Sequence, residues 1–144
     1  MADVFDVAKY ILSKKGDMST WKLQKLCYYA QAWHYTWTEK PLFRNRIEAW
    51  ANGPVVVDLY QMHRGKFMVS ETDISAGNPG ALTPDETDSV DIVLSDYGDK
   101  EPYELRELTH LESPWKNART GVPDGARCSN EITLESMGAY YGSL

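Results

Sequence analysis

The sequence predicts a mainly α fold, a compact bundle of six or seven helices with at most one short two-stranded β ribbon. Three observations predict this class. Apolar residues recur at helical spacing over most of the chain, capping residues stand where several of these segments begin, and glycine or proline separates one segment from the next. The chain has 144 residues with no internal repeat and no long linker, so residues 1–144 are expected to form one domain.

Two helices are predicted in the first forty residues. Residues 3–15 form the first, which ends at Gly16. Ser19 is expected to cap the second, whose apolar residues follow the 3.6-residue period from Leu23 to Trp37. Tyrosines carry the aromatic character of this second helix around most of its circumference. Such a helix is expected either to lie at the centre of the core or to be half exposed for a partner.

The middle of the chain predicts the only strands. Residues 47–50 read as a short extended segment, and 54–63 as a third helix with a proline at its first position. Residues 67–69 are expected to pair with 47–50 as the ribbon, although such a ribbon is marginal by itself. Residues 71–82, which contain two glycines and a proline, are predicted to form a loop.

The second half predicts helices again. The strongest start signal precedes the helix expected over 84–97, where Thr83 and Glu86 have the spacing of a capping box and Pro84 suits the first helical position. Shorter helices are expected at 102–109, at 114–119 and from Thr133 to Tyr141.

Composition restricts the classes of function. The formal net charge is −6, which disfavours nonspecific nucleic-acid binding. No apolar run approaches the roughly 18 residues that a membrane span requires, and the N-terminus does not resemble a signal peptide, so a cytoplasmic protein is expected. Cys27 and Cys128 are far apart and are expected to be free thiols in a reducing compartment.

The charges are unevenly distributed along the chain. Residues 1–70 carry ten Lys and Arg against six Asp and Glu, whereas residues 71–107 carry two against eleven. Asp88 and Asp91 lie in the middle of the acidic segment. This segment is either an ordinary solvated helix face or a surface that steers a cationic partner protein.

No catalytic, cofactor-binding or metal-binding residues are predicted. The three histidines, His34, His63 and His110, stand in no zinc-binding pattern, and the chain has no phosphate-binding loop and no nucleophile elbow. A hydrolase that uses Cys128 with His34 or His110 stays open as a minor hypothesis, because the members of a catalytic triad need not be close in sequence. His110 is otherwise expected to satisfy backbone carbonyls between two short helices.

The five tryptophans and nine tyrosines are a heavy aromatic load for a chain of this size. Most of them are expected to lie in the core. Tyr28, Tyr29 and Tyr35 point in several directions around one helix and are candidate anchors for a partner protein. The two N-terminal helices also resemble a weak helix-turn-helix. A DNA-binding regulator of its own operon is therefore the alternative to a protein-binding module.

Three segments together resemble a known family: Lys22-Leu-Gln-Lys-Leu-Cys-Tyr-Tyr-Ala-Gln-Ala-Trp33, Pro41-Leu-Phe43, and Ile47-Glu-Ala-Trp-Ala-Asn-Gly-Pro-Val55. They are similar to the Panacea, or SocA-like, antitoxin domain, formerly called GepA. Tyr97-Gly98, 105–110, 114–119 and Tyr140 extend the resemblance over nearly the whole chain. Cys27, Thr20 and Val57 depart from the residues common in the family, and these departures are local.

The resemblance implies a type II antitoxin that is not an enzyme, is encoded on a prophage or mobile element, and neutralises a cognate toxin by direct protein–protein binding. It implies no cofactor and leaves a homo-oligomer or hetero-oligomer open. The residues that carry it are expected to be structural: Lys22, Gln24, Trp33, Trp50, Gly53, Pro54, His110, Pro114 and Trp115.

Overall fold

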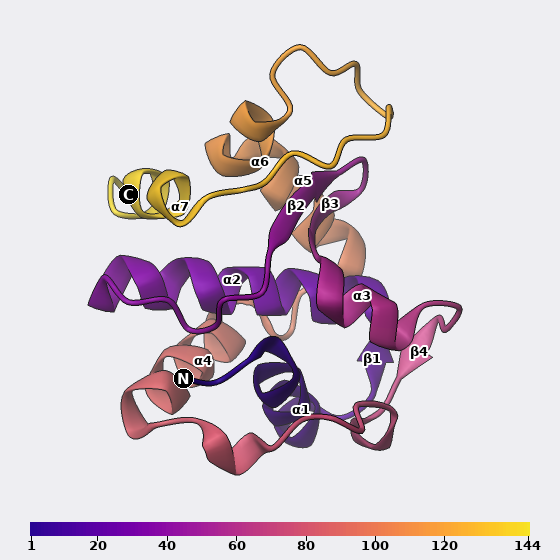
Figure 1. Ribbon diagram of the computed structural model, residues 1–144, viewed down its shortest axis with the longest axis vertical. Coiled ribbons are helices and arrows are strands. Elements are labelled where there is room, and N and C mark those ends of the chain that lie inside the picture. The colour runs from indigo at the N-terminus through magenta and orange to yellow at the C-terminus, as the bar shows by residue number, and fades with distance from the viewer.

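The computed structural model describes residues 1–144, and its longest helix, α2 (Thr20–Thr38), runs through the middle of the molecule (Figure 1). The other helices are α1 (Val4–Lys15), α3 (Val57–His63), α4 (Pro84–Tyr97), α5 (Pro102–Leu111), α6 (Ser113–Ala118) and α7 (Leu134–Tyr141). Helices α1 and α4 pack on one side of α2, and α5 and α7 on the other. These seven helices confirm the predicted mainly α class. No helix is both long enough and apolar enough to cross a bilayer.

The predicted helix starts are confirmed at three caps. The Ser19 hydroxyl accepts a hydrogen bond from the backbone N–H of Lys22, at 3.1 Å, and so caps α2. Thr83 and Glu86 form the reciprocal capping box of α4, with distances of 3.3 and 2.8 Å. Thr133 caps α7. Each cap satisfies backbone donors that have no partner within the helix.

A local hairpin replaces the predicted start of the third helix. Strands β2 (Ile47–Trp50) and β3 (Gly53–Val56) are antiparallel, and α3 begins only at Val57. Pro54 therefore lies in a strand, opposite Ala49, and does not open a helix as expected. The backbone N–H of Ala49 points away from β3 and donates to the carbonyl of Asn130. Ala49 and Pro54 therefore exchange no backbone hydrogen bond, and the missing N–H of Pro54 costs the hairpin nothing.

The predicted pairing of residues 67–69 with 47–50 is wrong. Strand β2 already has a neighbour on each edge, because Ala49 N and Ile47 O bond to the segment 130–132 on the side away from β3. Residues Met68–Val69 form β4, which pairs instead with β1 (Met18–Ser19), so the fold has two small ribbons where one was expected. The predicted loop 71–82 contains two 3₁₀ turns, Glu71–Asp73 and Pro79–Ala81.

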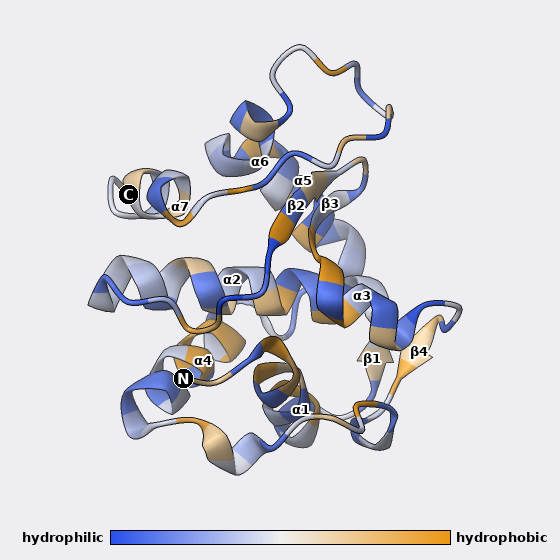
Figure 2. Ribbon diagram, in the orientation of Figure 1, coloured by the Kyte–Doolittle hydropathy of each residue, from blue (hydrophilic) through white to orange (hydrophobic).

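Helix α2 is buried on nearly all of its sides. Residues 23–32 are all buried, although the helix contains glutamine, lysine and several tyrosines. The ribbon of α2 is pale or blue along much of its length in Figure 2. The polar groups of such a helix need partners inside the protein, and those partners shape the site described next.

Candidate functional site

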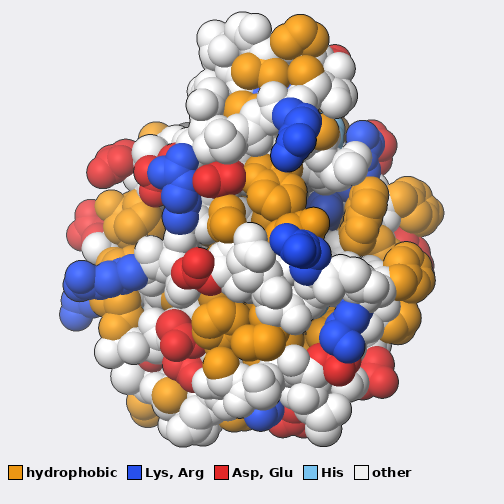
Figure 3. Space-filling view, turned by 45° about the vertical axis from the view of Figure 1, so that its right-hand side comes forward, with side chains coloured by type: hydrophobic (Ala, Val, Ile, Leu, Met, Phe, Trp, Pro, Cys, Tyr) orange, Lys and Arg blue, Asp and Glu red, His pale blue; other side chains and the backbone are white.

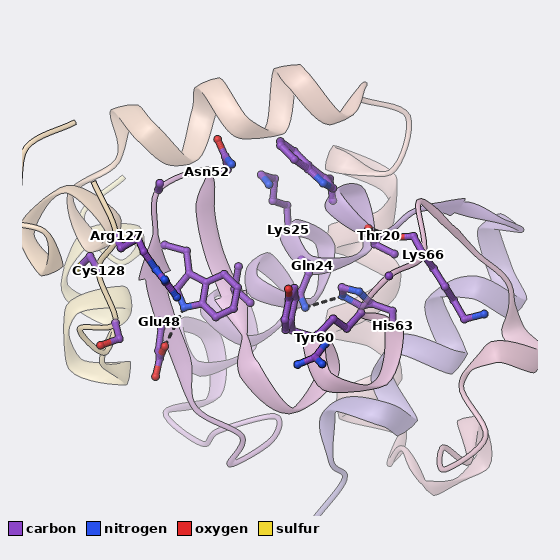
Figure 4. Close-up of a pocket in the computed structure, with 17 residues that line it drawn as sticks. Thr20, Gln24, Lys25, Glu48, Asn52, Tyr60, His63, Lys66, Arg127 and Cys128 are labelled. Carbon is purple, nitrogen blue, oxygen red and sulfur yellow. Dashed lines mark hydrogen bonds between the residues drawn. The ribbon is translucent and has the colours of Figure 1, made fainter. Parts of the chain in front are cut away.

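A cleft of about 720 Å³ opens at the N-terminal end of α2. Its walls come from the first turns of α2, the β2–β3 hairpin, the end of α3 with the turn after it, and residues 127–129. Figure 4 shows Arg127 and Cys128 at one end, Thr20 and Lys66 at the other, and Gln24 and Lys25 between them. The volume lies within the roughly 300–1,000 Å³ that is usual for ligand pockets.

Gln24 fixes the hairpin to α2. Its side-chain oxygen accepts from the backbone N–H of Val56 at 2.8 Å, and its amide nitrogen donates to the carbonyl of Val56 at 3.2 Å. The same amide nitrogen lies 3.0 Å from Nε2 of His63 (Figure 4). Burial lowers the pKa of His63, which suits a neutral ring that accepts this hydrogen bond. The Gln24 amide therefore pairs with the backbone of β3 in the way that a residue of a neighbouring strand would.

Gln31 repeats this arrangement two turns further along α2. Its oxygen accepts from the backbone N–H of Leu42 at 2.7 Å, and its nitrogen donates to the carbonyl of Phe43 at 2.6 Å. The segment that leads into the hairpin is thus held by the same kind of bond as the hairpin itself.

The opposite side of the hairpin is held by α5 and α6. The indole N–H of Trp115 donates to the carbonyl of Trp50 at 2.9 Å, and Nε2 of His110 lies 3.2 Å from the carbonyl of Ala51. The other ring nitrogen of His110 lies 2.7 Å from the carbonyl of Arg106, and its ring packs on that of Trp115. These contacts place His110 at backbone carbonyls as expected, but neither is the terminal carbonyl of a helix, since Ala51 lies in the turn of the hairpin and Arg106 in the middle of α5.

Lys25 is the exceptional group in the cleft. The residue is only 3% exposed, and its ammonium group, which forms no hydrogen bond or ion pair with the chain, still reaches the solvent of the cleft. It lies 5.4 Å from the centre of the Trp21 ring, and its aliphatic end passes over Gly53, where a Cβ would come within 3.1 Å of Cε. Burial, and then the nearby charge of Arg106, lower the pKa of Lys25 to about 8.

The cleft is basic and aromatic in an acidic protein. Lys25, Arg64, Lys66 and Arg127 line it with one carboxylate, Glu48. That carboxylate is already engaged, because it accepts from Arg46 and from the indole of Trp50, both at 2.8 Å.

Exposed apolar side chains adjoin this basic surface. Trp21 lines the cleft and is 46% exposed, and Phe67 and Met68 follow directly after the lining residue Lys66 and are also exposed. The face that Figure 3 turns toward the viewer carries apolar and basic side chains, together with several acidic ones. Aromatic and arginine side chains together are typical of the energetically dominant parts of protein interfaces.

The structure corrects the expectation that Tyr28 and Tyr29 are surface anchors. Their side chains are 1% and 0% exposed. The Tyr29 and Tyr141 hydroxyls both donate to Glu112, at 2.7 and 2.8 Å, and Tyr28 bonds to Tyr141. Burial raises the pKa of Glu112. These tyrosines form a hydrogen-bonded aromatic core between α2 and α7, so neither is free to contact a partner.

The remaining partner residues from the sequence are at the surface. Tyr35 is partly exposed on α2, and Asp88 and Asp91 are exposed on α4. Asp91 accepts a hydrogen bond of 2.6 Å from the hydroxyl of Tyr10. None of the three lines the cleft, so the structure does not join them to the basic site.

The other family-motif residues occupy structural positions. Trp33 donates from its indole to the Tyr97 hydroxyl at 3.0 Å, Pro114 is buried in the first turn of α6, and Pro54 is buried in β3. Lys22 contributes the backbone N–H that the cap of α2 binds.

Sequence reasoning missed Lys25 and Trp21 as site residues. One available signal was a lysine with aromatic neighbours at helical spacing, since Trp21 lies four residues before Lys25 and Tyr28 and Tyr29 lie three and four residues after it. The burial of α2 also argues against the helix-turn-helix interpretation, because a recognition helix must present an exposed face to a DNA groove.

Cys128 lines the cleft, but His110 does not. No group of three or more His, Cys, Asp or Glu side chains is placed to hold a metal ion.

The fold and the cleft define a small helical protein with a basic and aromatic cleft at one end of its central helix. Residues 23–116 match the family described as the antitoxin SocA-like, Panacea domain. The chain belongs to this family of antitoxins. The match includes all of the hairpin and most of α2, the elements that the two glutamines join. Comparison with curated proteins gave no match, and comparison with solved structures gave none either.

Proposed function

We propose that this chain is the antitoxin of a type II toxin–antitoxin system and neutralises a cognate toxin by binding it directly. The family match carries this proposal. The exposed mixture of aromatic, apolar and basic side chains around the cleft supports it, because such a surface suits a protein partner. The chain acts as one domain in the cytoplasm, without chemistry of its own, and its gene lies on a prophage or mobile element beside that of the toxin.

The test is co-expression with the product of the neighbouring reading frame. The neighbour alone should arrest growth, this chain should restore it, and the two proteins should co-purify. Restored growth without a complex between the two proteins would contradict direct binding.

The acidic face of α4 is proposed as a second contact with the toxin. Asp88 and Asp91 are exposed on a helix that carries no basic residue, so the charges of this helix would attract a basic patch on the toxin. This contact is separate from the cleft, and its loss should affect the rate of association more than the lifetime of the complex.

A further inference from the structure

The cleft contains a largely buried positive charge that no anion of the chain pairs with. Lys25 is only 3% exposed. The charged group with the largest effect on its pKa is Arg106, which is also positive. The only carboxylate in the cleft, that of Glu48, is bonded to Arg46 and Trp50. A buried charge in a protein is usually paired, so the site lacks one component.

We propose that this component is a carboxylate of the toxin, and that the cleft binds a segment of the toxin in which acidic and apolar side chains alternate. The inference rests on the proposed function, since it takes the toxin as the occupant. A carboxylate oxygen meets Lys25 Nζ in the middle of the cleft, and apolar side chains of the same segment pack on the rings of Trp21, Trp50 and Tyr60.

The separation of the basic groups favours a peptide segment over a phosphate. Figure 4 shows Arg127 at one end of the cleft and Lys66 at the other, with Lys25 between them, so these three cations do not converge on one point. A phosphate carries up to two charges in one small group and is bound by several donors that converge on it. Cations that are spread along a cleft are complementary to carboxylates that are spread along a peptide.

The surroundings of Lys25 add selectivity to this contact. Trp21 lies against the ammonium group on one side, and Gly53 leaves only enough room for the lysine to pass over the hairpin. An acidic side chain gains a charge-assisted bond at this point, whereas an amide of the same shape leaves the ammonium without its counter-charge.

The test uses the full chain and a defined peptide. The acidic probe is acetyl-Glu-Phe-Glu-Leu-amide, the uncharged match is acetyl-Gln-Phe-Gln-Leu-amide, and AMP represents phosphate ligands. Binding is followed by NMR through the side-chain signals of Lys25, which are assigned by their loss in Lys25→Met. The acidic peptide should bind saturably and about tenfold more tightly than either its amide match or AMP.

Two variants separate a specific contact from general electrostatics. Lys25→Met should weaken the acidic peptide about tenfold, whereas Lys116→Met, which removes an equal charge from the surface of α6, should leave its affinity unchanged. No saturable binding, equal affinity for the two peptides, equal losses in the two variants, or tighter binding of AMP at Lys25 would each overturn the inference.

The growth assay distinguishes failure of this inference from failure of the proposed function. If wild type and Lys25→Met neutralise the toxin equally well, the proposed site is wrong and the antitoxin function stands. If the peptide binds as expected but the wild-type chain neutralises no neighbouring product, the antitoxin function is wrong and the carboxylate site stands.

Discussion

Replacing Lys25 with methionine should make the protein more stable while it removes the proposed contact with the toxin. Burial lowers the pKa of this lysine from 10.5 to about 8. A change of about 2.5 in pKa corresponds to about 3 kcal/mol that the folded state loses by keeping the group charged at pH 7. Methionine has a similar length and no charge, so the variant avoids this cost.

Part of the gain is offset by a lost contact. The Lys25 ammonium lies 5.4 Å from the centre of the Trp21 ring, and such a cation–π contact contributes about 0.5–2 kcal/mol. The expected net increase in the free energy of unfolding at pH 7 is therefore about 1–3 kcal/mol, measured by urea denaturation. Lys22→Met, one turn earlier on the same helix and only partly buried, is the control and should change stability by less than about 0.5 kcal/mol.

The pH dependence of the difference identifies its cause. Between pH 8 and 10.5 the unfolded chain keeps a proton on Lys25 that the folded chain has released, so the wild-type free energy of unfolding gains from this group as the pH rises. The advantage of Lys25→Met should be full below pH 8 and should disappear near pH 10.5. A variant that is less stable than wild type at pH 7, or a difference that does not change with pH, would refute the reasoning.

Three further predictions concern the hairpin and the acidic helix. Gly53→Ala should destabilise the fold by about 1–3 kcal/mol in urea denaturation, because Gly53 has a φ of +128° and its new Cβ would lie 3.1 Å from the lysine beside it; an unchanged midpoint would show that the hairpin adapts. Gln24→Leu should cost about 2–4 kcal/mol by the same measurement, because it leaves the N–H and carbonyl of Val56 buried without partners, and a cost below 1 kcal/mol would contradict this role. Asp88→Asn with Asp91→Asn should slow association with the toxin at low salt but not at high salt in stopped-flow measurements, and an association rate that does not respond to the substitutions at any ionic strength would remove the steering role.

Local signals predicted much of the helical framework. The caps at Ser19, Thr83 and Thr133 were recognisable because capping depends on residues only three positions apart. The hairpin was not, because Asn52-Gly53-Pro54 suits either a turn into a helix or a turn between strands. The choice depends on Gln24 and on residues 130–132, which are distant in sequence.

The candidate site was less predictable than the framework. Helical periodicity identifies one buried face, but α2 is buried on nearly every face, so Tyr28 and Tyr29 could not be assigned to core or surface from spacing alone. Lys25 was hidden for the same reason. Its isolation arises from the packing of the hairpin and α5 against α2, which the aromatic residues beside it in sequence do not by themselves predict.

Gln24 and Gln31 form hydrogen bonds with backbone N–H and carbonyl groups, which every residue other than proline provides. Substitutions of exposed residues such as Asn52 in the turn of the hairpin can therefore change the surface of the protein without breaking the hydrogen bonds that hold the hairpin. In evolution, exposed residues can therefore be exchanged for residues that fit a different toxin while the hydrogen bonds of the two glutamines are kept.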